Sequence, residues 1–119
     1  MIDKKLKTVI ERNNLAFATI DKNNKPNVVY FSCVKVISKN QLLITDNYMN
    51  KTRKNILKNP TCALAVTDSK LDCGYQLKGK AKYFFSGKWL KQVKALKENK
   101  GHPAKGAVVV TIKEIIALA

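Results

Sequence analysis

The sequence predicts a small, mainly β protein, an antiparallel barrel of six strands with peripheral helices. Three observations lead to this fold class. The chain has 119 residues, of which 45% are hydrophobic, so it is expected to form one domain, residues 1–119, with its own core. Short apolar runs follow one another, separated by turn-forming residues. Most of these runs have no helix after them, which favours antiparallel over parallel pairing.

The first half of the chain is expected to hold one helix and three strands. Apolar residues recur at helical spacing from Ile2 to Ile10, which predicts an amphipathic helix ending at Asn13 and Asn14. Alternation with period two then predicts a strand, and two further apolar runs follow after short turns. The three expected strands are residues 15–21, 27–37 and 42–46.

The second half is expected to hold two helices and three strands. Asn50 is expected to cap a two-turn helix that Pro60 ends, and Ser86 to cap a helix that buries Trp89. Gly79 predicts a bend or bulge of the kind that barrel corners require. The expected elements are helices over residues 51–57 and 88–97, and strands over residues 61–68, 74–85 and 106–116.

The charge balance is strongly basic. There are 23 Lys and Arg against eight Asp and Glu, a net charge of +15, but only Arg12 and Arg53 are arginines. Proteins that recognise specific bases or phosphates favour arginine, because its planar guanidinium group donates two parallel hydrogen bonds. We therefore interpret most of this charge as a solvated surface and expect no nucleic-acid partner. A basic nucleic-acid-binding module is kept as an alternative that the charge alone supports.

Cysteine usage and hydropathy predict the compartment. Cys33, Cys62 and Cys73 form no C-x-x-C motif and His102 stands alone, so we expect free thiols and no metal site. The longest apolar runs, residues 62–66 and 115–119, have five residues each, whereas a membrane span needs about 20. The first residues lack the apolar stretch of a signal peptide. We expect a cytoplasmic protein with no membrane partner.

The stretch from Leu42 to Pro60 has the most informative pattern. A strand opens into a polar loop, and the following helix begins with Lys51 and Thr52. Backbone N–H groups at a helix start, a lysine ammonium and a threonine hydroxyl can together bind a phosphate. An ordinary helix with a lysine in its first turn remains the alternative.

With the segments around it, this stretch makes the chain resemble the FMN-binding split barrels related to pyridoxamine 5'-phosphate oxidase, especially the short stand-alone FMN-binding proteins. The resemblance extends from Leu15 to about Leu118. It depends on the order of several motifs: Ala16-Phe-Ala-Thr-Ile-Asp, Lys25-Pro-Asn-Val-Val, Phe31-Ser-Cys-Val-Lys-Val, Leu43-Ile-Thr-Asp, Asn50-Lys-Thr, Asn59-Pro and Gly74-Tyr-Gln-Leu-Lys-Gly-Lys-Ala.

The resemblance implies FMN as the cofactor. Carried over to this chain, it implies that Lys51 and Thr52 would hold the phosphate, helped by Ser32 or Lys35. Backbone groups of Cys33 and Thr45 would bond the polar edge of the flavin ring. No residue is identified as a catalytic acid or base. Carried over position by position, the implied cofactor contacts are Tyr30, Phe31, Ser32, Cys33, Val34, Lys35, Thr45, Asp46, Lys51, Thr52 and Gln76.

The resemblance also implies a homodimer with the flavin at the subunit interface, and an oxidoreductase or electron-transfer function with an unknown redox partner. Oxidation of pyridoxamine phosphate itself is not expected. The chain has Tyr30 and Lys51-Thr52 where the oxidase has an arginine and two adjacent basic residues, and its last residues lack the Arg- and His-containing tail. A deazaflavin coenzyme or haem in the same barrel is the alternative, with His102 a poor candidate for a haem ligand.

Overall fold

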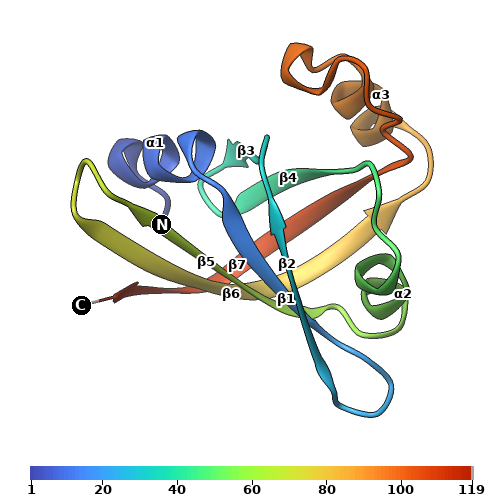
Figure 1. Ribbon diagram of the computed structural model, residues 1–119, viewed down its shortest axis with the longest axis horizontal. Helices are drawn as coiled ribbons and strands as arrows, with labels where there is room; N and C mark the ends of the chain where they lie inside the picture. Colours follow the sequence, from blue (N-terminus) through green and yellow to red (C-terminus); the bar gives the residue numbers. More distant parts are fainter. Residues whose placement is uncertain (119) are drawn as a thin grey trace.

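The computed structural model describes residues 1–118, which form three α-helices, one 3-10 helix and a single sheet of seven strands (Figure 1). Every strand pairing is antiparallel. The predicted mainly β fold class is confirmed, with one strand more than expected. In chain order the elements are α1 (Lys4–Arg12), β1 (Leu15–Ile20), β2 (Pro26–Phe31), β3 (Lys35–Ser38), β4 (Gln41–Asp46), α2 (Lys51–Lys58), β5 (Thr61–Asp68), β6 (Cys73–Phe84), α3 (Lys88–Lys94), η1 (Lys97–Asn99) and β7 (Gly106–Leu118).

The extra strand arises because the predicted strand over residues 27–37 is broken. Cys33 adopts a left-handed backbone conformation with φ of 58°, which an extended strand does not contain. The strands before and after the break, β2 and β3, lie at opposite edges of the sheet, whose order is β2-β1-β5-β6-β7-β4-β3. Because three residues reach only about 10 Å, the sheet must curl until its edges approach, forming a barrel that is split at this point.

Alternate side chains of the strands form the core inside this curled sheet. The burial pattern of β5 alternates regularly, as its sequence predicts, with Leu64 and Val66 facing inward. α1 covers one end of the barrel and buries Leu6, Val9 and Ile10. α3 forms a second, smaller cluster on the outer face of β4 and β7.

Two predicted helix details differ from the structure. α3 follows Gly87, whose φ of 92° favours glycine, so Ser86 is not its N-cap. Asn50 does precede α2, but its side chain makes no capping hydrogen bond. Among the described residues, no helix has the length and apolar character needed to cross a membrane.

Asp68 joins the end of β5 to α1. Its carboxylate is almost fully buried and accepts hydrogen bonds from Arg12 Nε at 2.6 Å, Arg12 Nη2 at 2.7 Å, Asn13 Nδ2 at 2.8 Å and the Leu71 backbone N–H at 2.9 Å. These donors, the Arg12 guanidinium first, hold the pKa of Asp68 well below its usual range.

Acid is therefore expected to destabilise the protein through Asp68. The unfolded carboxyl group titrates near its ordinary pKa of about 3.9, whereas the folded one stays ionised at lower pH. Its contribution to stability is present above that value and is lost as the pH falls below about 4. Urea midpoints measured at pH 6 and pH 3 should fall further for the wild type than for Asp68→Asn. Equal falls would contradict this assignment.

Candidate functional site

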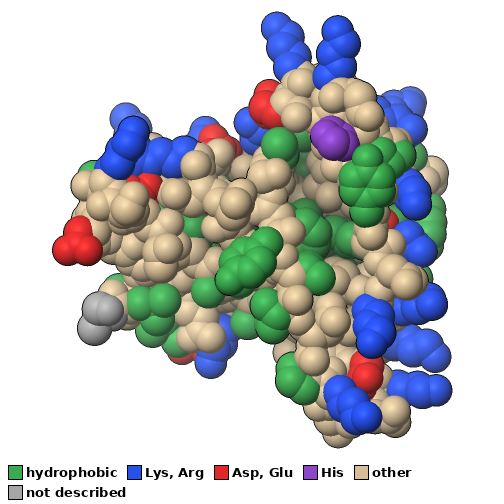
Figure 2. All heavy atoms as spheres, in the orientation of Figure 1, with side chains coloured by type: hydrophobic (Ala, Val, Ile, Leu, Met, Phe, Trp, Pro, Cys, Tyr) green, Lys and Arg blue, Asp and Glu red, His purple; other side chains and the backbone are tan. Residues whose placement is uncertain are grey.

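A cavity of about 530 Å³ opens at the split of the barrel, a volume typical of small-molecule and cofactor sites. Its first wall is the end of β2 and the break after it, from Tyr30 to Cys33. The second is the end of β4, the following loop and the start of α2. The third is the segment around η1, which contributes Glu98, Asn99 and His102. Figure 2 shows this face, with the single histidine in purple at its rim.

The start of α2 presents groups of the kind that bind an anion. Lys51 and Thr52 both line the cavity, and the first turn holds no acidic residue. The first backbone N–H groups of a helix have no intrahelical partners and carry the partial positive charge of the helix end, and here the Asn50 side chain does not accept from them. Thr52 Oγ1 accepts a long hydrogen bond, 3.4 Å, from Asn27 Nδ2, which leaves its hydroxyl proton free to donate. This donor set suits a phosphate.

Thr45, at the end of β4, contributes an unsatisfied hydroxyl to the same cavity. Within residues 1–118, its Oγ1 is the one buried side-chain oxygen or nitrogen without a hydrogen-bond partner. A buried polar group left in this state costs about 1–3 kcal/mol. A polar ligand in the cavity would supply the missing partner. The cavity therefore combines donors for a phosphate with a polar atom that a second part of the ligand can satisfy, and FMN fits this combination.

Asp46 lies beneath the cavity loop rather than in the cavity. Its buried carboxylate accepts hydrogen bonds from the Tyr83 hydroxyl and, at 2.8 Å, from the Met49 backbone N–H. Arg53 Nη1 lies 3.4 Å from the same carboxylate and donates to the Met49 carbonyl at 3.1 Å. Burial and the bond to Asp46 raise the pKa of Tyr83 to about 12, so the phenol stays protonated and donates. These bonds fix the loop that leads into α2, and Asp46 is a positioning residue.

Replacing Tyr83 with phenylalanine is expected to lower the free energy of unfolding by about 1–3 kcal/mol, because a buried Asp46 oxygen loses the Tyr83 hydroxyl and keeps only the long contact from Arg53 Nη1, 3.4 Å away. Urea denaturation would measure the change. Tyr75→Phe, on the same strand, is the matched control, since the structure gives its hydroxyl no hydrogen bond among residues 1–118. Equal stability of the two variants would contradict the role given to Tyr83.

Polar contacts hold the third wall against the rest of the site. Asn47 and Asn99 exchange two amide hydrogen bonds, of 2.7 and 3.0 Å. Lys35 Nζ lies 2.6 Å from Glu98 Oε2, and this pairing raises the pKa of Lys35 and lowers that of Glu98. The connection between α3 and β7 therefore closes the cavity through contacts between segments distant in the sequence.

Tyr48 and His102 form an exposed pair at the rim. The Tyr48 hydroxyl lies 3.1 Å from His102 Nδ1, and the two rings meet edge to face with centroids 5.9 Å apart. This contact engages Nδ1 and leaves Nε2 available to a ligand.

Sequence comparison identifies the family. The sequence model of the family described as pyridoxamine 5'-phosphate oxidase matches residues 2–119. The chain belongs to this family. An uncharacterised protein of Methanocaldococcus jannaschii is 44% identical over 115 residues, which cover 92% of this chain and 75% of that protein.

Solved structures share the family's split-barrel fold at low sequence identity. HupZ of Group A Streptococcus has a TM-score of 0.91 at 22% identity, covering 99% of this chain and 94% of that one. An FMN-binding protein of Syntrophomonas wolfei has a TM-score of 0.78 at 17% identity, covering 95% and 83%. An F420 reductase and HutZ, the heme storage protein of Vibrio cholerae, have the same fold, with TM-scores of 0.74 and 0.71.

The positions that the family resemblance implied fall into two groups. Those that line the cavity are Tyr30, Phe31, Ser32, Cys33, Thr45, Lys51 and Thr52. Val34, Lys35, Asp46 and Gln76 do not line it. Val34 is packed in the core, Lys35 is paired with Glu98, and Asp46 supports the loop from below. Gln76 lies on the outer face of β6, between Ala65 and Ile116 of the neighbouring strands.

Two parts of the site were not predicted from the sequence. One is the loop from Asn47 to Asn50, which the polar run between Thr45 and Lys51 could have indicated. The other is the third wall with His102, for which the sequence holds no local signal. Asn47 and Asn99 are 52 positions apart, so only folding brings these segments together.

Proposed function

We propose that this member of the pyridoxamine 5'-phosphate oxidase family binds FMN in the cavity at the split of the barrel and takes part in hydride or electron transfer. The observation that carries the proposal is the joint presence, in one cavity, of the unpartnered Thr45 hydroxyl and the uncapped start of α2 with Lys51 and Thr52. The FMN-binding protein of Syntrophomonas wolfei, which shares the fold, supports the same choice of cofactor.

The residues of the cavity have distinct roles in this proposal. Lys51, Thr52 and the backbone N–H groups of α2 would hold the phosphate. Thr45 would hydrogen-bond a polar group of the ring or ribityl chain, and Tyr30 and Phe31 would exclude water from the cavity wall. Bound FMN would supply the redox chemistry, and the protein's contribution would be to hold and orient it and to tune its electrostatic surroundings.

An absorption spectrum of the purified protein, before and after addition of FMN, tests the proposal. We expect flavin bands and saturable quenching of flavin fluorescence. Riboflavin, which lacks the phosphate, should bind at least about 10-fold more weakly, because it cannot use the charge-assisted bonds at α2. A protein that takes up no FMN would overturn the proposal. If the deazaflavin F420 bound more tightly than FMN, F420 would replace FMN as the proposed cofactor.

We propose further that two chains associate through the outer face of β2, β1 and β5. Tyr30 and Val28 are 76% and 60% exposed there, which is unusual for large apolar side chains on a continuous surface. Beside them the adjacent strands present small side chains, Ala16 and Ala18 on β1 and Ala63 and Ala65 on β5. Because Tyr30 also lines the cavity, a second copy on this face would complete the cofactor site.

Ala65→Arg places a charge in the middle of this face and is expected to convert a dimer to a monomer. Sedimentation velocity would measure the state, and FMN titration would show a parallel loss of affinity. Thr8→Arg, on the exposed side of α1, is the control and should stay dimeric. A wild-type monomer at micromolar concentration would contradict the proposed association.

A second candidate function, haem binding, is supported by His102. Its contact with Tyr48 orients the ring at the cavity rim and leaves Nε2 for a metal, and HutZ, of the same fold, is described as a heme storage protein. Titration with hemin should then give a Soret band that His102→Ala shifts or removes. If hemin produces no band dependent on His102, haem is excluded and FMN stays the proposed cofactor.

A further inference from the structure

A second groove lies on the outer face of β6 and β7, between Pro60 after α2 and Trp89 of α3. Its volume is about 360 Å³, and it shares no lining residue with the cofactor cavity. The groove is therefore a separate feature for which the proposed FMN site has no use.

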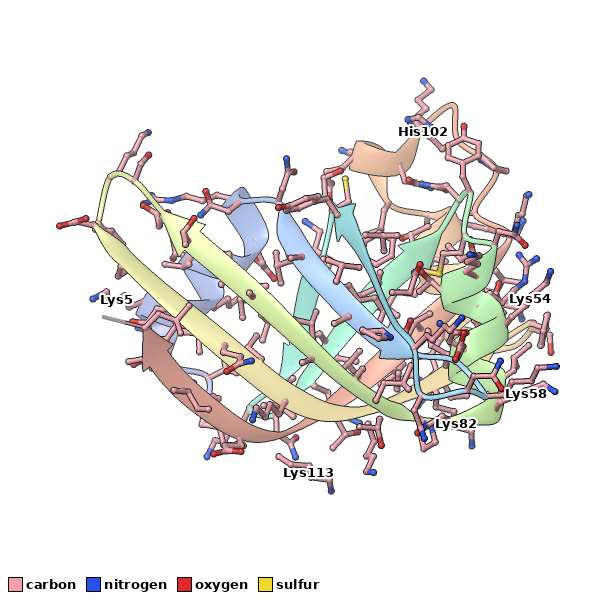
Figure 3. The ribbon with its side chains drawn as sticks, turned by 60° about the horizontal axis from the view of Figure 1, so that its bottom comes forward. Lys5, Lys54, Lys58, Lys82, His102 and Lys113 are labelled. Atoms are coloured by element: carbon pink, nitrogen blue, oxygen red, sulfur yellow. The ribbon has the colours of Figure 1, made fainter. Side chains whose placement is uncertain are left out.

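Two lysines line this groove. Lys80 and Lys82 alternate on the exposed side of β6 and line it. The Ala81 backbone N–H donates to the Pro60 carbonyl at 2.7 Å, which holds the end of α2 beside them. Figure 3 accordingly shows Lys54 and Lys58 of α2 and Lys82 of β6 on the same side of the molecule, with Lys5 at the opposite end. None of the residues that line the groove is acidic.

Two aromatic rings form the apolar part of the groove. Trp89 and Phe84 are both half-buried and line it. Each ring already has a lysine ammonium over its face, Lys88 Nζ at 4.7 Å from the Trp89 centroid and Lys82 Nζ at 5.4 Å from that of Phe84. Partly exposed rings with cations held against them combine a stacking surface for bases with charges for phosphates.

We propose that this groove binds single-stranded nucleic acid. A base stacks on Trp89, and Lys80 and Lys82 contact the phosphates on either side. Side chains that alternate along a strand recur every two residues, about 7 Å apart, so Lys80 and Lys82 leave β6 at a spacing that suits successive phosphates of an extended strand. Lys80 Nζ now donates to the exposed Thr61 hydroxyl at 3.0 Å, and it would turn from this contact to a phosphate. The indole ring of Trp89 favours a nucleic acid over an acidic protein as the ligand. An acidic protein would contact the lysines, but it has no base to stack on the ring.

The test uses a fluorescein-labelled 12-nucleotide oligothymidylate and two readouts. Fluorescence anisotropy reports binding, and the fluorescence of Trp89, the single tryptophan of the chain, reports stacking in the groove. We expect binding and tryptophan quenching to saturate together, at the same concentration with and without bound FMN. This independence separates a failure of the groove from a failure of the cofactor site.

Two matched variants locate the interaction. Lys80→Gln with Lys82→Gln should weaken binding about 10-fold or more and make the slope of log K against log salt shallower by about 1.4, which is two phosphate contacts at about 0.7 each. Lys5→Gln with Lys7→Gln removes the same charge from α1. It should change neither the affinity for the oligonucleotide nor the salt dependence strongly. Trp89→Leu should weaken binding about 5- to 100-fold.

Four outcomes would overturn the proposal. They are an anisotropy change without tryptophan quenching, equal losses in the two lysine variants, displacement of the strand by polyglutamate at equal charge concentration, and quenching by thymidine monophosphate with the same affinity as the strand. The third would indicate a surface for any polyanion, including an acidic protein, and the fourth a site for a free nucleotide.

Discussion

Lys51→Ala combined with Thr52→Ala is expected to weaken FMN binding about 10²- to 10⁴-fold. The double variant removes the ammonium and the hydroxyl at the start of α2, each the donor of one charge-assisted hydrogen bond of about 1.5–3 kcal/mol to a phosphate. Titration of flavin fluorescence against protein concentration would measure the loss. Affinity for riboflavin should change little, because these two side chains act on the phosphate.

The control keeps the helix and changes its charge by a larger amount. Lys54→Ala with Lys58→Ala alters two exposed lysines of α2 that do not line the cavity, and FMN affinity should change by less than about 5-fold, the screened effect of distant surface charge. Because Thr52 is buried, Lys51→Ala alone is a second test that leaves the core intact. If the control variant lost as much affinity as the double variant, the phosphate would not lie at the start of α2.

Gly79→Ala is expected to destabilise the fold by about 3 kcal/mol, the upper part of the range for overpacking, which lowers the melting temperature by roughly 10–20 °C. The register between β6 and β7 shifts between Lys78 and Gly79, which confirms the predicted bulge. A Cβ at Gly79 would collide with the Thr111 carbonyl oxygen, lie 2.9 Å from its carbonyl carbon and lie 3.1 Å from Ile112 Cα. These are backbone atoms of a paired strand, so they cannot move without breaking the pairing.

Gly74→Ala, on the same strand, is the control for this prediction. Its Cβ would meet the flexible Thr67 methyl group at 3.2 Å and the Val66 carbonyl oxygen at 3.4 Å, so a small side-chain adjustment relieves the contact. Calorimetry of the two variants should therefore give clearly different melting temperatures. Similar values would mean that the strands separate at Gly79 at little cost.

The sequence by itself determined the local structure. Helical spacing of apolar residues placed α1, and period-two alternation placed the strands, because both signals come from which side of an element meets the core. It also placed Lys51 and Thr52 together at the start of α2, where we propose that a phosphate binds, since these residues and the backbone that holds them are consecutive. Residues adjacent in the chain keep their relation in any fold that forms the helix.

Only the tertiary structure decided the break at Cys33, the place of Asp46 beneath the loop, the third wall with His102, and the groove that joins Trp89 to the lysines of β6. Each depends on how separate helices and strands pack against one another or on the curvature of the whole sheet. The physical reason is that the hydrophobic periodicity of a segment predicts which of its side chains are buried. Which residues those side chains contact depends on the topology of the whole chain. Asp46 shows this directly, because a strand-end carboxylate that could face a ligand is instead held by Tyr83, 37 residues away.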